Sequence, residues 1–263
     1  PNNENKDKVS NYSFDFDGVD DKVELGTQSF GITGAISVSA WVKIPTTNTG
    51  GGGTNIQQFV CEDRTSGTSR NWSLSWRGGG LNRISAVLFD SLGTAVVVTS
   101  TAIVPNDGNW HHLMFTYTGD TTADGLKLFI DGIQRMQATS TNGGLRSTTA
   151  VVPTIGGLSQ TTSWMFEGNI DEVAIFDTDQ SLNIATIYNS GTPTTITGAL
   201  SHYKMGEEAT FSTNWTVPDA AGSNDGTSAN MTIEDRVGEA PNSTNNALSF
   251  NMDEVDRVED TPS

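Results

Sequence analysis

The fold is decided by one stretch, Ile36-Ser37-Val38-Ser39-Ala40-Trp41-Val42-Lys43. Apolar residues from Ile36 to Val42 occupy every second position, and in a β-strand such residues share one face. The opposite face carries Trp41, Lys43 and two serines. The stretch therefore predicts a strand that packs one face against an apolar core.

Similar short runs, separated by Gly, Asn, Asp and Thr turns, recur from residue 12 to residue 204. One of them, Leu126–Ile130, is followed by Asp131-Gly132, which is typical of a tight hairpin turn. Only Ser181–Tyr188 is predicted as a helix, with Ser181 as its N-cap. The pattern predicts an all-β fold, a two-sheet antiparallel jelly-roll sandwich with one short helix and an extended C-terminal segment.

Composition excludes several classes of protein. The chain has 263 residues and a formal net charge of -17, which repels phosphate, so nucleic acid is not an expected partner. No run reaches the roughly 18 apolar residues of a membrane-spanning helix, so no membrane is expected either. The single Cys61 leaves no intrachain disulfide and no cysteine-based zinc site. The chain begins at Pro1, and we expect a piece cut from a longer chain.

Charge and composition change near Gly206, where no further lysine follows. We therefore predict a sandwich domain over residues 1–206 and an acidic, Asn/Ser/Thr-rich segment over 207–263. Within that segment, Asn-Met-x-x-x-Asp-Arg-Val occurs twice, at 230–237 and at 251–258. Two interpretations stay open: two similar units that pack on the sandwich, or a pair of docking segments for a partner.

Five motifs carry a resemblance to a known family: Phe14–Asp21 (FDFDGVDD), Ile36–Lys43, Asn109–Leu113 (NWHHL), Leu126–Gly132 (LKLFIDG) and Phe166–Phe176 (FEGNIDEVAIF). In this order and spacing they resemble laminin-G-like, pentraxin-like jelly rolls of the concanavalin A-like lectin/glucanase type, over roughly residues 12–205. The acidic remainder resembles the C-terminal part of such modules in structural proteins of marine bacteriophages. The fold hosts many functions, so the resemblance bears on fold more than on activity.

Catalytic carboxylates are not expected. Glucanase relatives of this fold carry a Glu-x-Asp-x-x-Glu strand motif that places the acid and the nucleophile on one face. This spacing does not occur here, and pairs such as Asp171-Glu172 point to opposite faces of a regular strand. We therefore predict that the protein is not an enzyme.

The resemblance implies one structural Ca²⁺, where the loop after the first strand meets a late strand. The implied ligands are Asp17, the carbonyl of Gly18, Asp20 and Asp171. Asp171 has the strand parity of the apolar Val173, and a carboxylate on an apolar face must be paired or metal-bound. The alternative is an aspartate turn that accepts backbone N–H groups.

Glycan binding is the other function that the resemblance suggests. Trp164 follows a polar loop and is the candidate for stacking on a sugar ring. Trp72 and Trp76 share a face with Leu74 and are expected in the core. Trp41 is left open between a place on the concave sheet and one in the interior.

Our leading hypothesis is a non-catalytic structural or binding module of a phage particle, a capsid decoration or fibre-type protein that adheres to glycan. Its partners would be other virion proteins, copies of itself or a cell-surface glycan, and its location the virion. The alternative is a secreted bacterial carbohydrate-binding or adhesion module with structural calcium, located outside the cell or on its surface. A glycoside hydrolase of the same fold is the third hypothesis.

Overall fold

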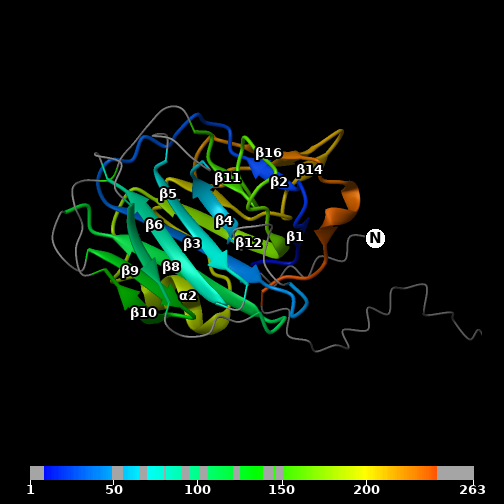
Figure 1. Cartoon of the computed structure of the whole chain (residues 1–263). Helices are drawn as coiled ribbons and strands as arrows, with labels where there is room; N and C mark the ends of the chain where they lie inside the picture. Colours follow the sequence, from blue (N-terminus) through cyan, green and yellow to red (C-terminus); the bar gives the residue numbers. More distant parts are fainter. Residues whose placement is uncertain are drawn as a thin grey trace, which may run out of the picture.

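The fold is described from a computed structural model, in which two antiparallel sheets face one another (Figure 1). The described residues are 9–48, 56–64, 70–79, 81–90, 95–100, 106–120, 125–138, 145 and 151–241. Within them the predicted all-β sandwich is confirmed.

The first sheet has eight strands among the described residues, in the order β10-β9-β8-β3-β12-β1-β17, with β13 also paired to β12. Their bounds are β1 (Ser13–Asp17), β3 (Ile36–Lys43), β8 (Trp110–Tyr117), β9 (Leu126–Ile130), β10 (Ile133–Gln137), β12 (Glu167–Phe176), β13 (Ser201–Tyr203) and β17 (Arg236–Val237). The stretch that decides the fold is thus a central strand, β3, between β8 and β12.

The second sheet has nine strands in the same part of the chain, in the order β14-β15-β16-β2-β11-β4-β5-β6-β7. Their bounds are β2 (Lys22–Glu24), β4 (Ile56–Glu62), β5 (Trp72–Arg77), β6 (Arg83–Phe89), β7 (Ala95–Thr99), β11 (Thr154–Ile155), β14 (Thr210–Phe211), β15 (Trp215–Val217) and β16 (Gly226–Ala229).

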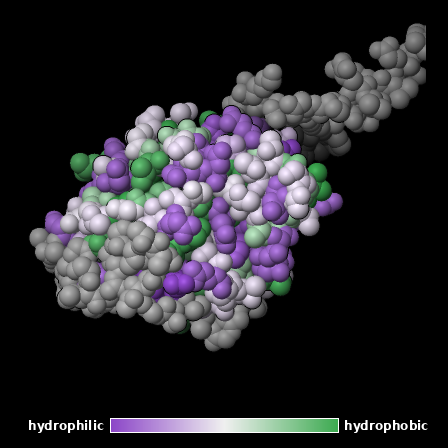
Figure 2. Space-filling view, turned by 90° about the horizontal axis from the view of Figure 1, so that it is seen from above, coloured by the Kyte–Doolittle hydropathy of each residue, from purple (hydrophilic) through white to green (hydrophobic). Residues whose placement is uncertain are grey.

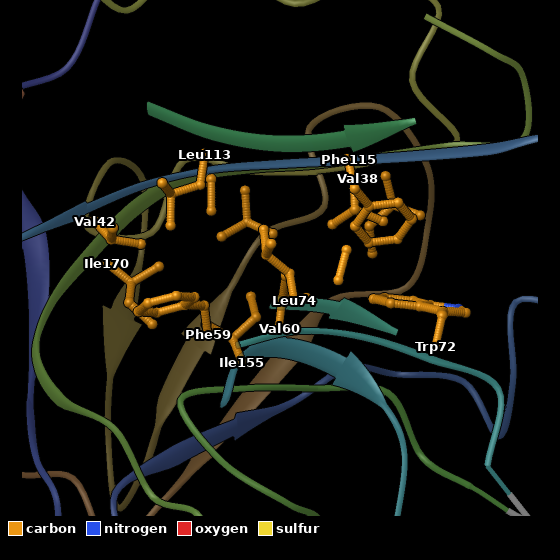
Figure 3. Close-up of a cluster of buried hydrophobic side chains, with 14 of the residues drawn as sticks. Val38, Val42, Phe59, Val60, Trp72, Leu74, Leu113, Phe115, Ile155 and Ile170 are labelled. Atoms are coloured by element: carbon orange, nitrogen blue, oxygen red, sulfur yellow. The ribbon is translucent and has the colours of Figure 1, made fainter. Parts of the chain in front are cut away.

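The core lies between the sheets, where side chains of both inner faces meet (Figure 3). Val38 and Val42 of β3 are buried there, at no more than 1% exposed, as the alternation predicts. Trp72 and Trp76 are also buried in this core, which confirms their predicted place. Burial of large apolar side chains stabilises such a sandwich by roughly 1.5–3 kcal/mol per side chain.

The predicted hairpin turn is present between β9 and β10. Asp131 and Gly132 both have positive φ, 51° and 72°, as a type I′ turn requires. The predicted helix, in contrast, begins later than Ser181: α2 covers Ile184–Tyr188, and its N-cap, Asn183, makes no side-chain capping bond. The Ser181 hydroxyl instead donates to Asp179 Oδ2, 2.9 Å away, which holds the preceding turn.

Helix α2 covers the outer face of the first sheet (Figure 1). It packs there on a second apolar cluster, formed by Met114, Phe129, Ala174, Phe176, Ile184 and Ile187. Trp41 lies near this cluster, with its ring stacked 6.0 Å from the Tyr188 ring and 5.2 Å from His112. Trp41 is therefore buried on the outer face of the first sheet, and it does not fill the interior between the sheets.

The C-terminal segment adds strands to both sheets. Strands β14 to β16 extend the second sheet beside β2, and β17 pairs with β1. In the first copy of the repeated unit, Met231 is buried, and the Arg236 guanidinium lies over the rings of Tyr12 and Trp215. The second copy, at 251–258, lies outside the described residues.

Figure 2 shows one face of the molecule, on which hydrophilic residues are widespread and hydrophobic ones lie scattered between them. Within the described ranges, no helix is long and apolar enough to cross a membrane.

Candidate functional site

The loop after β1 holds the first group of acidic side chains, Asp17, Asp20 and Asp21, here called the loop cluster. Asp17 Oδ1 accepts hydrogen bonds from the backbone N–H groups of Val19, at 2.7 Å, Asp20 and Asp21. Asp21 Oδ2 accepts one from the Asp17 N–H, 3.1 Å away. The carboxylates thus hold the turn in the way that the alternative interpretation predicted.

Burial, followed by the negative charge of Asp17, raises the pKa of Asp21 to about 7. Gly18 has φ +75°, and a Cβ added there would lie 2.9 Å from the Cβ of Glu167. Glycine is required here both for the positive φ and for the close approach of β12. The loop is therefore shaped by hydrogen bonds within the turn and by the close approach of β12.

Asp171 lies elsewhere. Asp17 pairs with Glu167 across β1 and β12, four residues before Asp171, a separation of roughly 13 Å along an extended strand. The structure therefore does not bring Asp171 together with Asp17, Gly18 and Asp20. The set of calcium ligands that the resemblance implied is divided between two places.

The prediction that Asp171 shares a face of the strand with Val173 is wrong. Ile170 faces the core, so Asp171 beside it points to the outer face of the sheet, where Trp41 is its cross-strand partner. A bulge follows between Asp171 and Ala174, with Glu172 at φ 47°. The bulge inserts an extra residue, and Val173 returns to the core face without sharing the face of Asp171.

This bulge marks a fork in the first sheet. One edge of β12 pairs with β1 up to Ile170 and with β13 from Val173 onward. The chain before β1 and the chain after β13 therefore converge at residues 171–172. A second acidic group lies at that point, Asp171, Glu172 and Glu207, here called the fork cluster.

One carboxylate oxygen from each member of the fork cluster lies within 4.8 Å of one from each of the others. Asp171 Oδ2 accepts a hydrogen bond from the Ser10 hydroxyl at 2.5 Å. Glu207 Oε1 accepts from the N–H groups of Asn11 and Tyr12. Together these bonds tie the segment before β1 to the fork.

The third member, Glu172, contacts His202, whose Nε2 lies 2.6 Å from Glu172 Oε2. Asp171 and Glu172 are almost fully buried, at 0% and 4% exposed, and Glu207 is half-buried. Burial, followed by the negative charges of Glu172 and Glu207, raises the pKa of Asp171 well above its ordinary value. Burial also raises the pKa of Glu207, to about 7.

Trp164 lies in the loop between β11 and β12, half-buried and with φ 63°. Its carbonyl accepts a hydrogen bond from the N–H of Gln58 in β4, at 2.9 Å. The Arg70 guanidinium contacts two rings, with its central carbon 4.2 Å from the centroid of Phe89 and 5.7 Å from that of Trp164. Asp63, which is buried, holds this guanidinium through two hydrogen bonds of 2.6 and 2.9 Å.

The arrangement around Trp164 combines a partly exposed indole with an oriented cation and polar neighbours. Arg64 bonds to Gln160 at the edge of this site, and the hydroxyl of Thr161 contacts that of Ser163. Such a surface can stack a flat apolar face while donating hydrogen bonds around it.

Three residues that organise these sites were missed by the reasoning from sequence: Glu207, Arg70 and Asp63. The spacing of Asp63 and Arg70 at either end of a short polar loop is a weak signal of their pairing. No sequence signal points to Glu207, because only the fork in the sheet brings it to Asp171.

The fold and the sites define a β-sandwich of the lectin-like type. Residues 17–187 match the profile of the concanavalin A-like lectin/glucanases superfamily, which covers more than half of the chain. The chain therefore belongs to this superfamily. No curated protein matches it by sequence.

Two solved structures show the same fold. A candidate carbohydrate-binding protein from Bacteroides ovatus is similar with a TM-score of 0.60 and 14% identity, over 85% of this chain and 59% of that one. The heptameric SAP-like pentraxin of Limulus polyphemus is similar with a TM-score of 0.51 and 11% identity, over 81% of this chain and 94% of that one. This chain thus spans less than two thirds of the Bacteroides protein, and at these identities the likeness is one of fold.

Proposed function

We propose that this chain is a non-catalytic binding module that recognises carbohydrate at the site around Trp164. The observation that carries the proposal is the placement of the Arg70 guanidinium, held by Asp63, beside the half-buried indole of Trp164. Sugar rings present apolar C–H faces and a rim of hydroxyls, which match an indole and fixed polar groups. The Bacteroides relative, described as a candidate carbohydrate-binding protein, supports this substrate class.

The absence of catalysis is part of the proposal. A retaining glycosidase needs two carboxyl groups about 5 Å apart on either side of a bound sugar. Among the described residues, both the fork cluster and the loop cluster bring carboxylates that close. Asp171 and Glu172 are buried and cannot reach a glycosidic bond, and Asp17 and Asp21 accept hydrogen bonds from the backbone of their own turn. The carboxylate near Trp164, Asp63, is buried and paired with Arg70.

A glycan array followed by titration calorimetry tests this function. We expect the wild type to bind a subset of glycans, and Trp164→Ala to weaken binding to them about tenfold or more, a loss of roughly 1.4 kcal/mol. Leu182→Ala is the matched control, since Leu182 is 96% exposed and lies near α2, away from the second sheet. An array without any bound glycan, or equal binding by Trp164→Ala, would contradict the proposal.

For the biological setting, we propose a place on a phage particle, as a capsid decoration or fibre-type protein. The support is the resemblance of the acidic segment 207–263 to phage structural proteins, since adhesion to host glycan suits such a protein. A secreted bacterial adhesion module is the alternative, favoured by the Bacteroides relative. Mass spectrometry of purified virions distinguishes the two, because the chain should be present only in the first case.

A further inference from the structure

We propose that the fork cluster of Asp171, Glu172 and Glu207 binds a divalent cation, Ca²⁺, which joins the segment before β1 to the bulge of β12. This site is separate from Trp164, and the inference does not rest on the proposed function. It also differs from the ligand set that the family resemblance implied, because the structure separates Asp171 from Asp17, Gly18 and Asp20.

The first support is that two buried carboxylate oxygens of the cluster lack hydrogen-bond partners in the described part of the chain. Glu172 Oε1 and Glu207 Oε2 are both buried and have no hydrogen-bond partner among the described residues. Glu172 is only 4% exposed, so water does not solvate its carboxylate freely. Leaving a charged, buried oxygen without a partner is costly, and native proteins rarely do so without an unseen ligand.

The second support is the charge balance. Three carboxylates converge at this point, and in the described part of the chain no lysine or arginine forms an ion pair with any of them. His202, which contacts Glu172 Oε2, supplies at most one positive charge. Buried like charges at this distance repel strongly, and a divalent cation between them turns the repulsion into attraction.

The chemistry of the donors selects the kind of cation. The nitrogen of His202 nearest the cluster already contacts Glu172, so the donors that remain are oxygens. Carboxylate oxygens suit a hard cation, and Ca²⁺ accepts carboxylates in one- or two-oxygen modes and in irregular geometry. Mg²⁺ demands a near-ideal octahedron and keeps several waters, which a buried site provides less easily.

The position explains what the ion would do. Ser10 bonds to Asp171 over 161 residues of sequence, and Tyr12 bonds to Glu207 over 195. The cation thus fastens three distant segments at the one place where β12 changes partners. We infer a structural role, in which the ion closes the sheet between β1 and β13.

The test is a comparison of melting temperatures in EDTA and in saturating Ca²⁺, with the calcium content of the purified protein measured in parallel. At about a hundredfold excess over Kd, we expect Ca²⁺ to raise the wild-type melting temperature by roughly 5–10 °C. Glu207→Gln and Glu172→Gln should lose most of this rise. In EDTA both should melt at or above the wild type, because each removes a repelling charge and keeps an acceptor oxygen.

Asp20→Asn in the loop cluster is the matched control and should keep the full response to Ca²⁺. The proposal is overturned if the wild type melts equally in EDTA and in Ca²⁺. It is also overturned if Asp20→Asn abolishes the response while the two glutamine variants keep it.

Discussion

The two acidic clusters contain three carboxylates each but satisfy them differently. In the loop cluster, the oxygens of Asp17 and Asp21 accept backbone N–H bonds and shape a turn near the surface. In the fork cluster, Asp171 and Glu172 are buried, and Glu172 Oε1 has no partner in the described part of the chain. The difference teaches that the count of acids does not show how they are satisfied, and that buried carboxylate oxygens without a partner set the fork cluster apart from the loop cluster.

The largest contrast is expected from paired alanine substitutions in Ca²⁺. Asp171→Ala removes the acceptor of the Ser10 hydroxyl and a ligand of the proposed ion, and should cost about 3 kcal/mol of unfolding free energy. Asp17→Ala removes only an exposed, cap-like acceptor and should cost about 1 kcal/mol. Denaturant unfolding measures both losses of unfolding free energy. Equal losses would contradict the claim that the two clusters differ in function.

A smaller effect is expected from the backbone of the loop. Gly18→Ala places a Cβ at φ +75° and within 2.9 Å of Glu167, and should cost about 1–2 kcal/mol. Because this cost is steric, it should be the same in EDTA and in Ca²⁺. A loss that appears only in Ca²⁺ would mean that the loop, too, holds an ion.

The smallest effect concerns pH. The pKa of Asp21 is raised to about 7 in the folded state, so the folded protein binds this proton more tightly than the unfolded chain. Stability should therefore fall as the pH rises from about 4 to about 7, and level off above it. Asp21→Asn should reduce this fall, so that the melting temperature drops by roughly 2–4 °C less than in the wild type over the same pH range.

The part of the slope that Asp21→Asn removes should be the same with and without Ca²⁺, because Asp21 lies outside the fork cluster. The part due to Glu207, whose pKa burial also raises to about 7, should instead depend on Ca²⁺. Melting curves of wild type and Asp21→Asn between pH 5 and pH 8 check this. A slope that the substitution leaves unchanged would assign the titration to another group, such as Glu62, whose pKa burial also raises to about 7.

Much of the fold was predictable because alternation is a local property. Every second residue of β3 is buried in the core, and the turn at Asp131-Gly132 follows from the residue types that positive φ favours. The helix was placed too early, because Ser181 bonds to Asp179 and not to the helix. The sequence pattern alone does not show whether a serine caps the helix that follows it or bonds to a residue in the turn before it.

The sites were less predictable, because they depend on register and on distant segments. The argument that Asp171 shares a face with Val173 assumes a regular strand, and it fails at the bulge. There Glu172 takes a left-handed conformation, which a glutamate in the sequence does not predict. Glu207 enters the cluster from beyond β13, and Ser10 from before β1. The role of Trp164 in stacking on a sugar ring stays a prediction. The contact between Trp164 and Arg70 could not be predicted from the sequence, because it forms only in the folded chain.

The most direct measurement is the position of a bound ion in a crystal soaked with Tb³⁺, a strong anomalous scatterer that replaces Ca²⁺ at oxygen sites. The account predicts an anomalous peak between the carboxylates of Asp171, Glu172 and Glu207. A peak at Asp17 and Asp20 with none at the fork would contradict it.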